Sequence, residues 1–201
     1  AMDDRATATA LINEAERAVR FFQGFLREPQ QVGSVIPSSR FLERRIVDTG
    51  DVRTARTVVE LGPGTGGTTH ALLRALPAEA RLLAIEIDAD FARALRHDIT
   101  DPRLAVHEGS AQHVAAALAA HGLPAPEVIV SGIPFSTMPG PLGEATLRAV
   151  GDAPAPGGPF VAYQFRDRVA VLGRPILGWP EVDMELLNVP PMRVYRWRKP
   201  V

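Results

Sequence analysis

The fold is decided by the stretch Thr57-Val58-Val59-Glu60-Leu61-Gly62-Pro63-Gly64-Thr65-Gly66-Gly67-Thr68-Thr69. Its first five residues form a short apolar run rich in β-branched side chains, which is typical of a buried strand. Alternating glycines follow at once, and Thr68 with Thr69 opens a helical pattern. Without a Cβ, such a turn lets a ligand reach the backbone amides at the start of the helix. The stretch therefore predicts an α/β domain with a ligand held at this turn.

Four more apolar runs predict strands, at residues 81–86, 104–107, 127–131 and 159–165. Segments that read as helices, such as 70–76 and 90–97, separate them. This repetition of strand and helix predicts a mostly parallel sheet covered on both faces. Near the end, residues 184–188 and 193–197 alternate in polarity around Pro190-Pro191, which predicts two directly joined strands. We therefore expect seven strands, with an antiparallel hairpin at the C-terminal edge.

The composition limits the classes of protein that the chain can belong to. Its 201 residues are 46% hydrophobic, enough for one substantial core. The net charge is −1, whereas proteins that bind nucleic acid usually carry a basic surface, so a nucleic-acid partner is not expected. No cysteine is present, and the five histidines show no metal-ligand spacing with carboxylates, so we expect no metal. No secretory signal or membrane-spanning run is visible, so we expect a cytoplasmic protein that associates peripherally with the membrane. The sequence does not fix the oligomeric state, and we expect a monomer.

The first part of the chain predicts helices of another kind. Apolar residues recur at helical spacing between Leu11 and Leu26, and Pro37-Ser38-Ser39 offers a second helix start. We divide the chain into a helical segment at 1–50, a lid or membrane contact, and a ligand-binding domain at 51–201. The first helix packs on the domain, lies on the inner face of an anionic membrane, or does each in turn, with the same face covering the site in solution and meeting lipid when bound. In the second case its phenylalanines and Leu26 enter the lipid, and its arginines lie near the phosphates.

Two cofactors compete for the glycine turn. Gly62, Gly64 and Gly67 satisfy the dinucleotide spacing, and Glu86 lies about 20 residues further on, where an acidic residue would hold an NAD ribose. However, Glu60 directly before the turn would repel a pyrophosphate, whereas a cationic methionine group tolerates a carboxylate. The ends of the other strands add Glu86, Gly109-Ser110-Ala111 and Ser131-Gly132-Ile133-Pro134-Phe135 at the same edge. This set favours S-adenosylmethionine.

With these motifs the chain resembles the class I S-adenosylmethionine-dependent methyltransferases, a Rossmann-like fold, over roughly residues 56–141. The resemblance implies that Glu60 positions the amino acid part of the cofactor and that Glu86 accepts the ribose hydroxyls. Many members carry Asp at the position of Ser110, so a bond to the adenine amino group is not implied there. The full set of implied cofactor-binding residues is Glu60, Gly62, Pro63, Gly64, Thr65, Gly66, Glu86, Ile87, Gly109, Ser110, Ala111 and Ser131.

The motif after the fourth strand bears on the methyl acceptor. In enzymes that methylate planar amines it begins with Asn or Asp, and here it begins with Ser131-Gly132, which argues against a nucleobase. Several segments in order resemble the bacterial phospholipid N-methyltransferases, which are relatives of the rRNA adenine dimethyltransferases. They are the N-terminal helix and residues 33–39, 131–135, 163–165 and 188–195. The resemblance implies stepwise methylation of the phosphatidylethanolamine headgroup toward phosphatidylcholine, with the phospholipid and an anionic membrane as partners.

This chemistry assigns candidate roles around the acceptor amine. The amine must be neutral to attack, and most of the rate can come from positioning. We expect Tyr163 to orient the headgroup, backbone carbonyls near Ser131 and Ile133 to accept from the amine, and Phe135 to form an aromatic wall or else a core contact. No residue stands out as a general base. Cations that could hold the phosphate follow the Tyr163 strand or open the last one: Arg166, Arg168 and Arg193.

Three other functions stay open at this point. The first is an RNA adenine N6-dimethyltransferase, and the second is a methyltransferase acting on another amino lipid. The third is a protein that binds S-adenosylmethionine without catalysis and serves as a membrane or partner adaptor.

Overall fold

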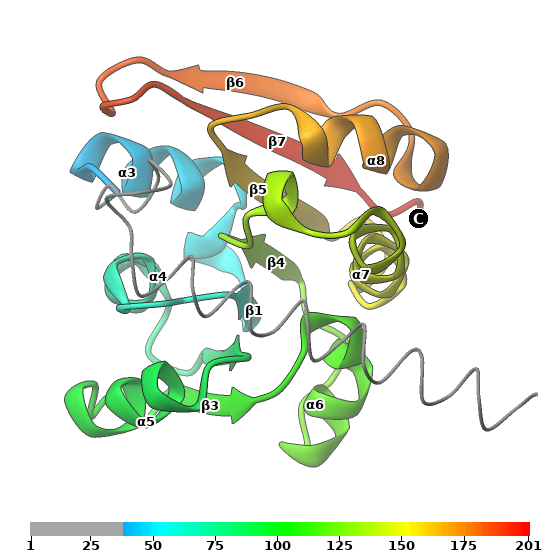
Figure 1. Cartoon of the computed structure of the whole chain (residues 1–201). Helices are drawn as coiled ribbons and strands as arrows, with labels where there is room; N and C mark the ends of the chain where they lie inside the picture. Colours follow the sequence, from blue (N-terminus) through cyan, green and yellow to red (C-terminus); the bar gives the residue numbers. More distant parts are fainter. Residues whose placement is uncertain (1–37) are drawn as a thin grey trace, which may run out of the picture.

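The structure is a computed structural model that describes residues 38–201. The helix predicted between Leu11 and Leu26 lies outside the described residues, and its membrane role stays a prediction. Seven strands form one sheet in the order β3-β2-β1-β4-β5-β7-β6 (Figure 1). Five of them are parallel: β1 (Thr57–Leu61), β2 (Arg81–Glu86), β3 (Leu104–Glu108), β4 (Val128–Ser131) and β5 (Pro159–Gln164). The predicted seven-stranded, mostly parallel sheet is confirmed.

Within residues 38–201, six α-helices cover the two faces of this sheet, three on each (Figure 1). One face carries α3 (Arg40–Thr49), α4 (Gly67–Ala75) and α5 (Ala89–Asp98). The other carries α6 (Val114–Ala120), α7 (Gly140–Asp152) and α8 (Arg168–Leu177). Short 3₁₀ turns occupy residues 52–54, 111–113 and 135–137. None of the helices within 38–201 combines the length and the apolar character that a membrane span needs.

Alternation along each strand assigns side chains to one face or the other. In β1, Val58 belongs to the core under α3, α4 and α5, whereas Val59 and Leu61 belong to the opposite core. All three are fully buried, and burial of each such side chain contributes about 1.5–3 kcal/mol. Glu60 alternates with Val59 and so faces α4. A carboxylate thus enters the core beside the glycine turn.

Helix α3 begins where the sequence predicts a helix start. Ser39 is its N-cap, and the Ser39 hydroxyl accepts a hydrogen bond from the Leu42 amide at 3.2 Å. Leu42, Ile46 and Val47 are buried against the sheet and share its core. This part of the predicted segment 1–50 therefore packs on the domain. The division of the remaining residues from the domain stays a prediction.

The C-terminal hairpin has β7 (Met192–Arg198) paired antiparallel with both β5 and β6 (Glu181–Glu185). The predicted antiparallel edge is confirmed, but its first strand begins at Glu181 and ends at Glu185 instead of spanning 184–188. The reason is that Asn188 leaves the ladder. Its side chain accepts from the Ser39 amide and donates to the Pro190 carbonyl, both at 2.9 Å.

Candidate functional site

Backbone hydrogen bonds join the loops that follow the parallel strands at one edge of the sheet. The Gly62 amide donates to the Ile85 carbonyl at 3.0 Å, and the Gly132 amide to the Leu61 carbonyl at 2.9 Å. The Gly109 amide donates to the Glu86 carbonyl at 2.8 Å. The structure therefore brings together the four segments that the sequence analysis placed at the carboxyl edge.

The glycines of the glycine turn have different structural roles. Gly62, Gly64 and Gly66 all have positive φ values, of 71°, 56° and 88°, which L side chains rarely adopt. A Cβ on Gly66 would come within 2.8 Å of the Leu95 side chain, so this glycine lets α4 and α5 approach. A Cβ on Gly64 would meet no atom within 4 Å. The backbone at Gly64 is therefore bare and open on the side where a ligand would lie.

Glu60 is a fully buried carboxyl group beside this turn. One oxygen, Oε2, accepts a hydrogen bond from the Thr69 hydroxyl at 2.7 Å. The other, Oε1, is buried and has no partner among the described residues. Burial raises the pKa of Glu60 to about 8, and the nearby charge of Glu86 pushes this pKa in the same direction. The unpartnered oxygen marks a place for a donor that a ligand would supply.

Glu86 is held by the backbone around it. Its Oε2 accepts from the Gly64 amide and its Oε1 from the Asp88 amide, both at 3.0 Å. Burial raises the pKa of this carboxyl group, while the backbone donors oppose that shift. Asp88 in turn caps α5 with one oxygen, and its Oδ2 is buried without a partner in the described part of the chain.

These features fit S-adenosylmethionine. The ammonium of its methionine part would supply the donor that Glu60 Oε1 lacks. Glu86 accepts from the Gly64 and Asp88 amides, and the Ile87 amide also acts on this carboxyl group; the ribose hydroxyls would use the acceptor positions that remain. Next to Glu86, Ile87 and Ser110 are partly exposed, and Ala111 is buried at the start of a 3₁₀ turn.

Tyr163, the predicted orienting residue, lies on the same face of the sheet as Glu60. Its hydroxyl is 3.2 Å from the Thr68 hydroxyl at the start of α4. A Cβ on Gly132 would come within 2.3 Å of the Tyr163 hydroxyl oxygen, so this ring fits only because residue 132 has no side chain. Burial, and next the charge of Glu60, raise the pKa of Tyr163 above its usual range. The phenol therefore stays protonated and can donate or accept a hydrogen bond.

Two predicted acceptor contacts are not supported by the geometry. The Ile133 carbonyl already accepts from the Gln164 side-chain amide at 2.7 Å and from the Phe135 amide at 2.9 Å. Both of its lone pairs are used, so it has none for an amine. Phe135 is fully buried in the core under α6, α7 and α8, which is the core contact allowed for it above and not an aromatic wall. Ser131 is also buried, and its hydroxyl accepts from the Ile133 amide at 3.3 Å.

The three predicted phosphate-binding arginines lie at the rim of this edge. Arg166 and Arg168 follow β5 and are exposed. Arg193 pairs in register with Gln164, and its guanidinium donates to the Phe165 carbonyl at 2.7 Å. They are available to an anion at the rim, and their role stays a prediction.

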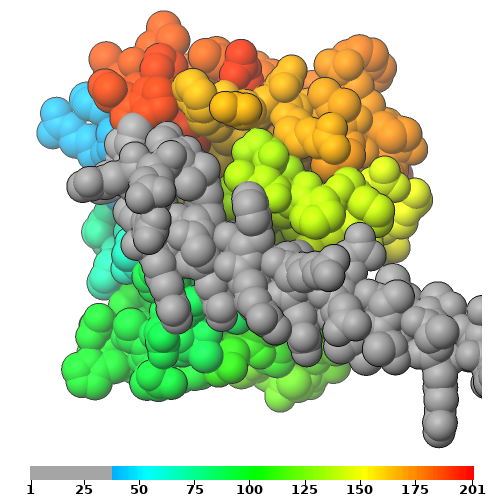
Figure 2. All heavy atoms as spheres, in the orientation of Figure 1, coloured from blue at the N-terminus to red at the C-terminus, as the bar shows by residue number. Residues whose placement is uncertain are grey.

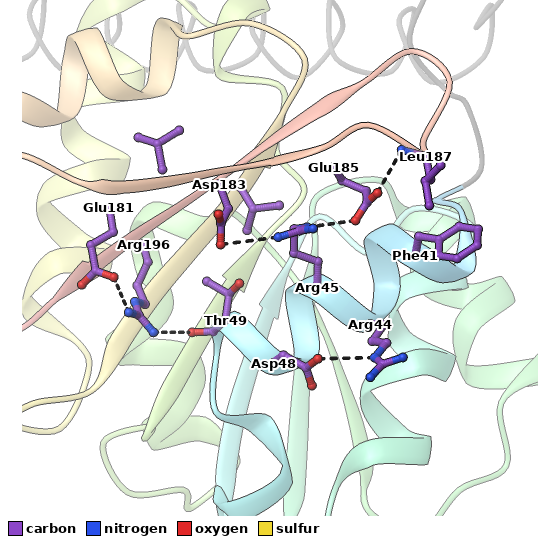
Figure 3. Close-up of a pocket in the computed structure, with 12 residues that line it drawn as sticks. Phe41, Arg44, Arg45, Asp48, Thr49, Glu181, Asp183, Glu185, Leu187 and Arg196 are labelled. Atoms are coloured by element: carbon purple, nitrogen blue, oxygen red, sulfur yellow. Dashed lines mark hydrogen bonds and ion pairs between the residues drawn. The ribbon is translucent and has the colours of Figure 1, made fainter.

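A pocket of about 600 Å³ lies elsewhere, between α3 and the β6–β7 hairpin (Figure 3). None of the predicted cofactor-binding residues lines it. Its charged side chains largely satisfy one another: Arg45 pairs with Asp183 and Glu185, and Arg196 pairs with Glu181. The ion pairs across this pocket hold the hairpin against α3. The pocket does not coincide with the edge where the strand-end motifs lie. Within residues 38–201, no group of three or more potential metal ligands occurs.

Four residues of the site were not assigned a role by sequence reasoning: Thr68, Thr69, Asp88 and Gln164. The two threonines could have been predicted from the sequence, because hydroxyls at the start of the helix that follows the glycine turn face the end of β1. Asp88 also carried one, as an acidic residue two positions after Glu86 that begins a helix. The role of Gln164 could not have been predicted, since its hydrogen-bond partner, the Ile133 carbonyl, is 31 residues away in the sequence.

Strand order, glycine turn and the two buried strand-end carboxyls together define a class I S-adenosylmethionine-dependent methyltransferase. Comparisons with known proteins agree. Residues 28–113 match the family model of the ribosomal RNA adenine dimethylases. An ornithine lipid N-methyltransferase from Singulisphaera acidiphila is 33% identical over 141 residues, which cover 70% of this chain and 73% of that protein. The chain belongs to the class I S-adenosylmethionine-dependent methyltransferases, and part of it is similar to the rRNA adenine dimethylases.

More distant relatives share only part of the chain or only its fold. Ribosomal RNA small subunit methyltransferase A from Laribacter hongkongensis is 39% identical over 92 residues, 46% of this chain and 30% of that protein. The crystal structure of the N-methyltransferase NodS from Bradyrhizobium japonicum, in complex with S-adenosylhomocysteine, superposes with a TM-score of 0.66 at 15% identity, covering 90% of this chain and 99% of that one. At this identity the superposition shows a shared fold alone, and the assignment as an S-adenosylmethionine-dependent N-methyltransferase rests on the 33% identical relative.

Proposed function

We propose that this enzyme methylates the amine of an amino-lipid headgroup. Phosphatidylethanolamine is the substrate predicted from the sequence, and an ornithine lipid is supported equally well. The match to the ornithine lipid N-methyltransferase covers 70% of the chain. The match to the ribosomal RNA methyltransferase covers 46%. A larger share of the chain is therefore similar to the lipid enzyme than to the RNA enzyme.

The observation that carries the proposal is the contact between Tyr163 and Gly132. The position that would carry an amide side chain for a planar base is Ser131, whose hydroxyl is buried in a bond with the Ile133 amide. Beside it, the Tyr163 hydroxyl lies against the bare Cα of Gly132. Among the described residues the Tyr163 hydroxyl is thus the group available to an acceptor, because Thr68 is its hydrogen-bond partner and the Gln164 amide is bonded to the Ile133 and Tyr163 carbonyls. A small alkyl amine needs a single partner of this kind, whereas the edge of a nucleobase needs more.

The protein's own residues account for binding and orientation. S-adenosylmethionine supplies the electrophilic methyl group, and Glu60 and Glu86 would hold its ammonium and its ribose. An alkylammonium has a pKa near 10.4, so the acceptor must lose a proton before it can attack. Burial around Tyr163 favours the neutral amine, because desolvation disfavours the charged form. The protonated phenol accepts one N–H of that amine and so directs the nitrogen lone pair.

A second candidate is methylation of adenine in RNA. The family match at residues 28–113 and the 39% identity to a ribosomal RNA methyltransferase favour it. The family match covers the glycine turn and Glu86, the predicted cofactor side, and ends before Ser131 and Tyr163. The net charge of −1 and the missing amide at Ser131 argue against RNA as the acceptor.

Transfer of a radiolabelled methyl group from S-adenosylmethionine to each candidate acceptor tests these functions directly. The protein is incubated separately with vesicles containing phosphatidylethanolamine, with vesicles containing an ornithine lipid, and with ribosomal RNA. We expect label in at least one lipid and none in RNA. Tyr163→Phe should lower turnover about tenfold or more, the equivalent of one lost hydrogen bond in the transition state, with little change in cofactor affinity.

Tyr195→Phe is the matched control. The Tyr195 hydroxyl is also buried but has no partner within the described residues, so its removal should leave turnover unchanged. Label found in RNA alone would establish the second candidate. Tight cofactor binding with no label in any acceptor would instead support the non-catalytic adaptor.

A further inference from the structure

The connection between β6 and β7, residues 186–191, presents large apolar side chains to solvent. We refer to it as the β6–β7 loop. Leu186 is 68% exposed, Leu187 63% and Val189 76%. Single exposed apolar residues are normal on a protein surface, but three within four positions form a patch. Phe41 at the start of α3 and Phe165 after β5 are exposed as well.

Polar bonds fix this loop with its apolar side chains outward. The Leu187 amide donates to Glu185 at 2.9 Å, and Glu185 is paired with Arg45 of α3 at 2.9 Å. Asn188 is 2% exposed and joins the loop to Ser39. Figure 3 shows Phe41 and Leu187 at the same end of the pocket, next to the Arg45–Glu185 pair. The exposure is therefore built into the loop by its buried neighbours.

The loop lies at the edge of the sheet where the methyl-transfer site is. Glu185 pairs with Met192, and Arg193 pairs with Gln164 at the carboxyl end of β5. The loop therefore follows β6 at the same edge that carries Gly132 and Tyr163. In Figure 1 it joins β6 and β7 above α3, and in Figure 2 its orange-red atoms lie on the surface next to the blue atoms of α3.

Next to this loop, the exposed charges within residues 38–201 are mostly basic. Arg40, Arg166 and Arg168 are exposed, and Arg193 is partly so. Asp167 is exposed among them, whereas Glu43 is bound to Arg74 and Glu185 to Arg45. The exposed acids Asp90 and Glu108 lie at the other end of this edge, beyond β2 and β3. A positive rim around apolar side chains, in a chain of net charge −1, is complementary to an anionic lipid surface.

We propose that the β6–β7 loop is a membrane-docking element, which inserts Leu186, Leu187 and Val189 into an anionic lipid surface and sets the acceptor edge against it. The inference rests on the proposed amino-lipid function and adds the surface that meets the bilayer. It concerns only described residues and is independent of the predicted N-terminal helix. A rigid apolar loop suits this role because no ordering is needed on binding.

The absence of cysteine makes a site-specific probe simple to place. Leu187→Cys in the full chain is labelled with an environment-sensitive fluorophore and mixed with vesicles of phosphatidylcholine that contain roughly one third phosphatidylglycerol. We expect a blue shift in emission that fades with added salt. Trp179→Cys is the control, because Trp179 is 79% exposed but precedes β6 at the opposite edge, and it should show no shift.

A second measurement tests the contribution of the loop to binding. Leu186→Ser/Leu187→Ser should weaken sedimentation with the same vesicles by roughly tenfold, while Trp179→Ser leaves it unchanged. Both side chains are exposed, so thermal stability and S-adenosylmethionine affinity should stay at the wild-type level. A blue shift that depends on protein concentration without vesicles would show that a second copy covers the loop, and would overturn the proposal. Unchanged sedimentation together with no blue shift would overturn it too.

The two proposals can fail separately. Loop-dependent vesicle binding without methylation of any lipid would retain the docking surface and reject the proposed substrate. Methylation of an amino lipid in vesicles by the double-serine variant at the wild-type rate would reject the docking surface and retain the substrate.

Discussion

At the scale of single residues, Glu60 links cofactor binding to pH. Its pKa is raised from 4.5 to about 8 because the carboxyl group is buried. Between these values the folded protein binds more protons than the unfolded chain, so stability falls as pH rises across this window. Near pH 7 Glu60 is mostly protonated in the free enzyme. A cofactor ammonium next to Oε1 would favour the ionised form.

Cofactor binding should therefore release a proton. We expect calorimetric titration at pH 7, in two buffers of different ionisation enthalpy, to show release of close to one proton per S-adenosylmethionine bound. The release should vanish well above pH 8, where Glu60 is already ionised. Glu60→Gln keeps the hydrogen bond from Thr69 and should release no proton at any pH. Equal proton release from the variant and the wild type would show that Glu60 does not face the ammonium.

Residue type and position were enough to predict which residues gather at the carboxyl edge of the sheet, and their contact with the cofactor stays a prediction. Glu60 and Glu86 stand at strand ends in the sequence, and parallel strands bring such ends to one edge. The acceptor side could not be predicted in the same way. Whether the Ile133 carbonyl is free depends on Gln164, and whether Phe135 is exposed depends on the packing of α7 and α8. Contacts between distant segments decide both.

At the scale of elements, the ion pair between Arg45 and Glu185 holds the edge hairpin against α3. Glu185 is 5% exposed, and the Arg45 guanidinium lowers the pKa of this carboxyl group below its ordinary value of 4.5. A lowered pKa means that the pair stabilises the fold above pH 4.5 and that this stabilisation is lost as pH falls through the folded-state pKa.

Removal of this pair should destabilise the protein in a pH-dependent way. We expect Arg45→Met to lower the free energy of unfolding at neutral pH by about 1–3 kcal/mol, because Glu185 is left buried without its partner. Arg44→Met is the control: the Arg44 side chain is 80% exposed and pairs with Asp48 one turn away, so its loss should cost less than about 0.5 kcal/mol. Urea titrations measure both. A gap between Arg45→Met and wild type that stayed constant below pH 4.5 would contradict the assignment.

The elements differ in how far the sequence could predict them. The five parallel strands were found almost to the residue, because each is an unbroken apolar run between polar loops. The strand at 181–185 was not, because its residues Glu181, Val182, Asp183 and Met184 are all exposed and show no buried alternation. Its position is set by Arg45, which lies 140 residues earlier than Glu185.

At the scale of the whole molecule, β7 is an inner strand that joins the edge strand β6 to the rest of the sheet. It contributes Val194, Tyr195 and Trp197 to the two cores and lies between β5 and β6. Each of these side chains contributes about 1.5–3 kcal/mol by its burial, so their sum is comparable with the total stability of a typical domain.

Truncation after Pro191 should therefore abolish the fold. We expect the shortened chain to lose its cooperative thermal transition in circular dichroism and its affinity for S-adenosylmethionine. Truncation after Lys199 is the control, since it removes only Pro200 and Val201, both exposed, and keeps the Lys199 hydrogen bonds with Gly157 and Gly158. If the chain ending at Pro191 still melted cooperatively and bound the cofactor, β7 would not be needed to close the sheet.

The inner position of β7 also has a consequence for synthesis in the cell. Within residues 38–201 the ribosome makes β7 after the six strands that precede it, so β6 emerges before the strand that it will pair with exists. Until then the outer side of β5 is an unpaired edge, and the leucines of the β6–β7 loop emerge with no folded neighbour to hold them. This nascent stage is the one most open to aggregation, and a chaperone that binds apolar segments would act on it best.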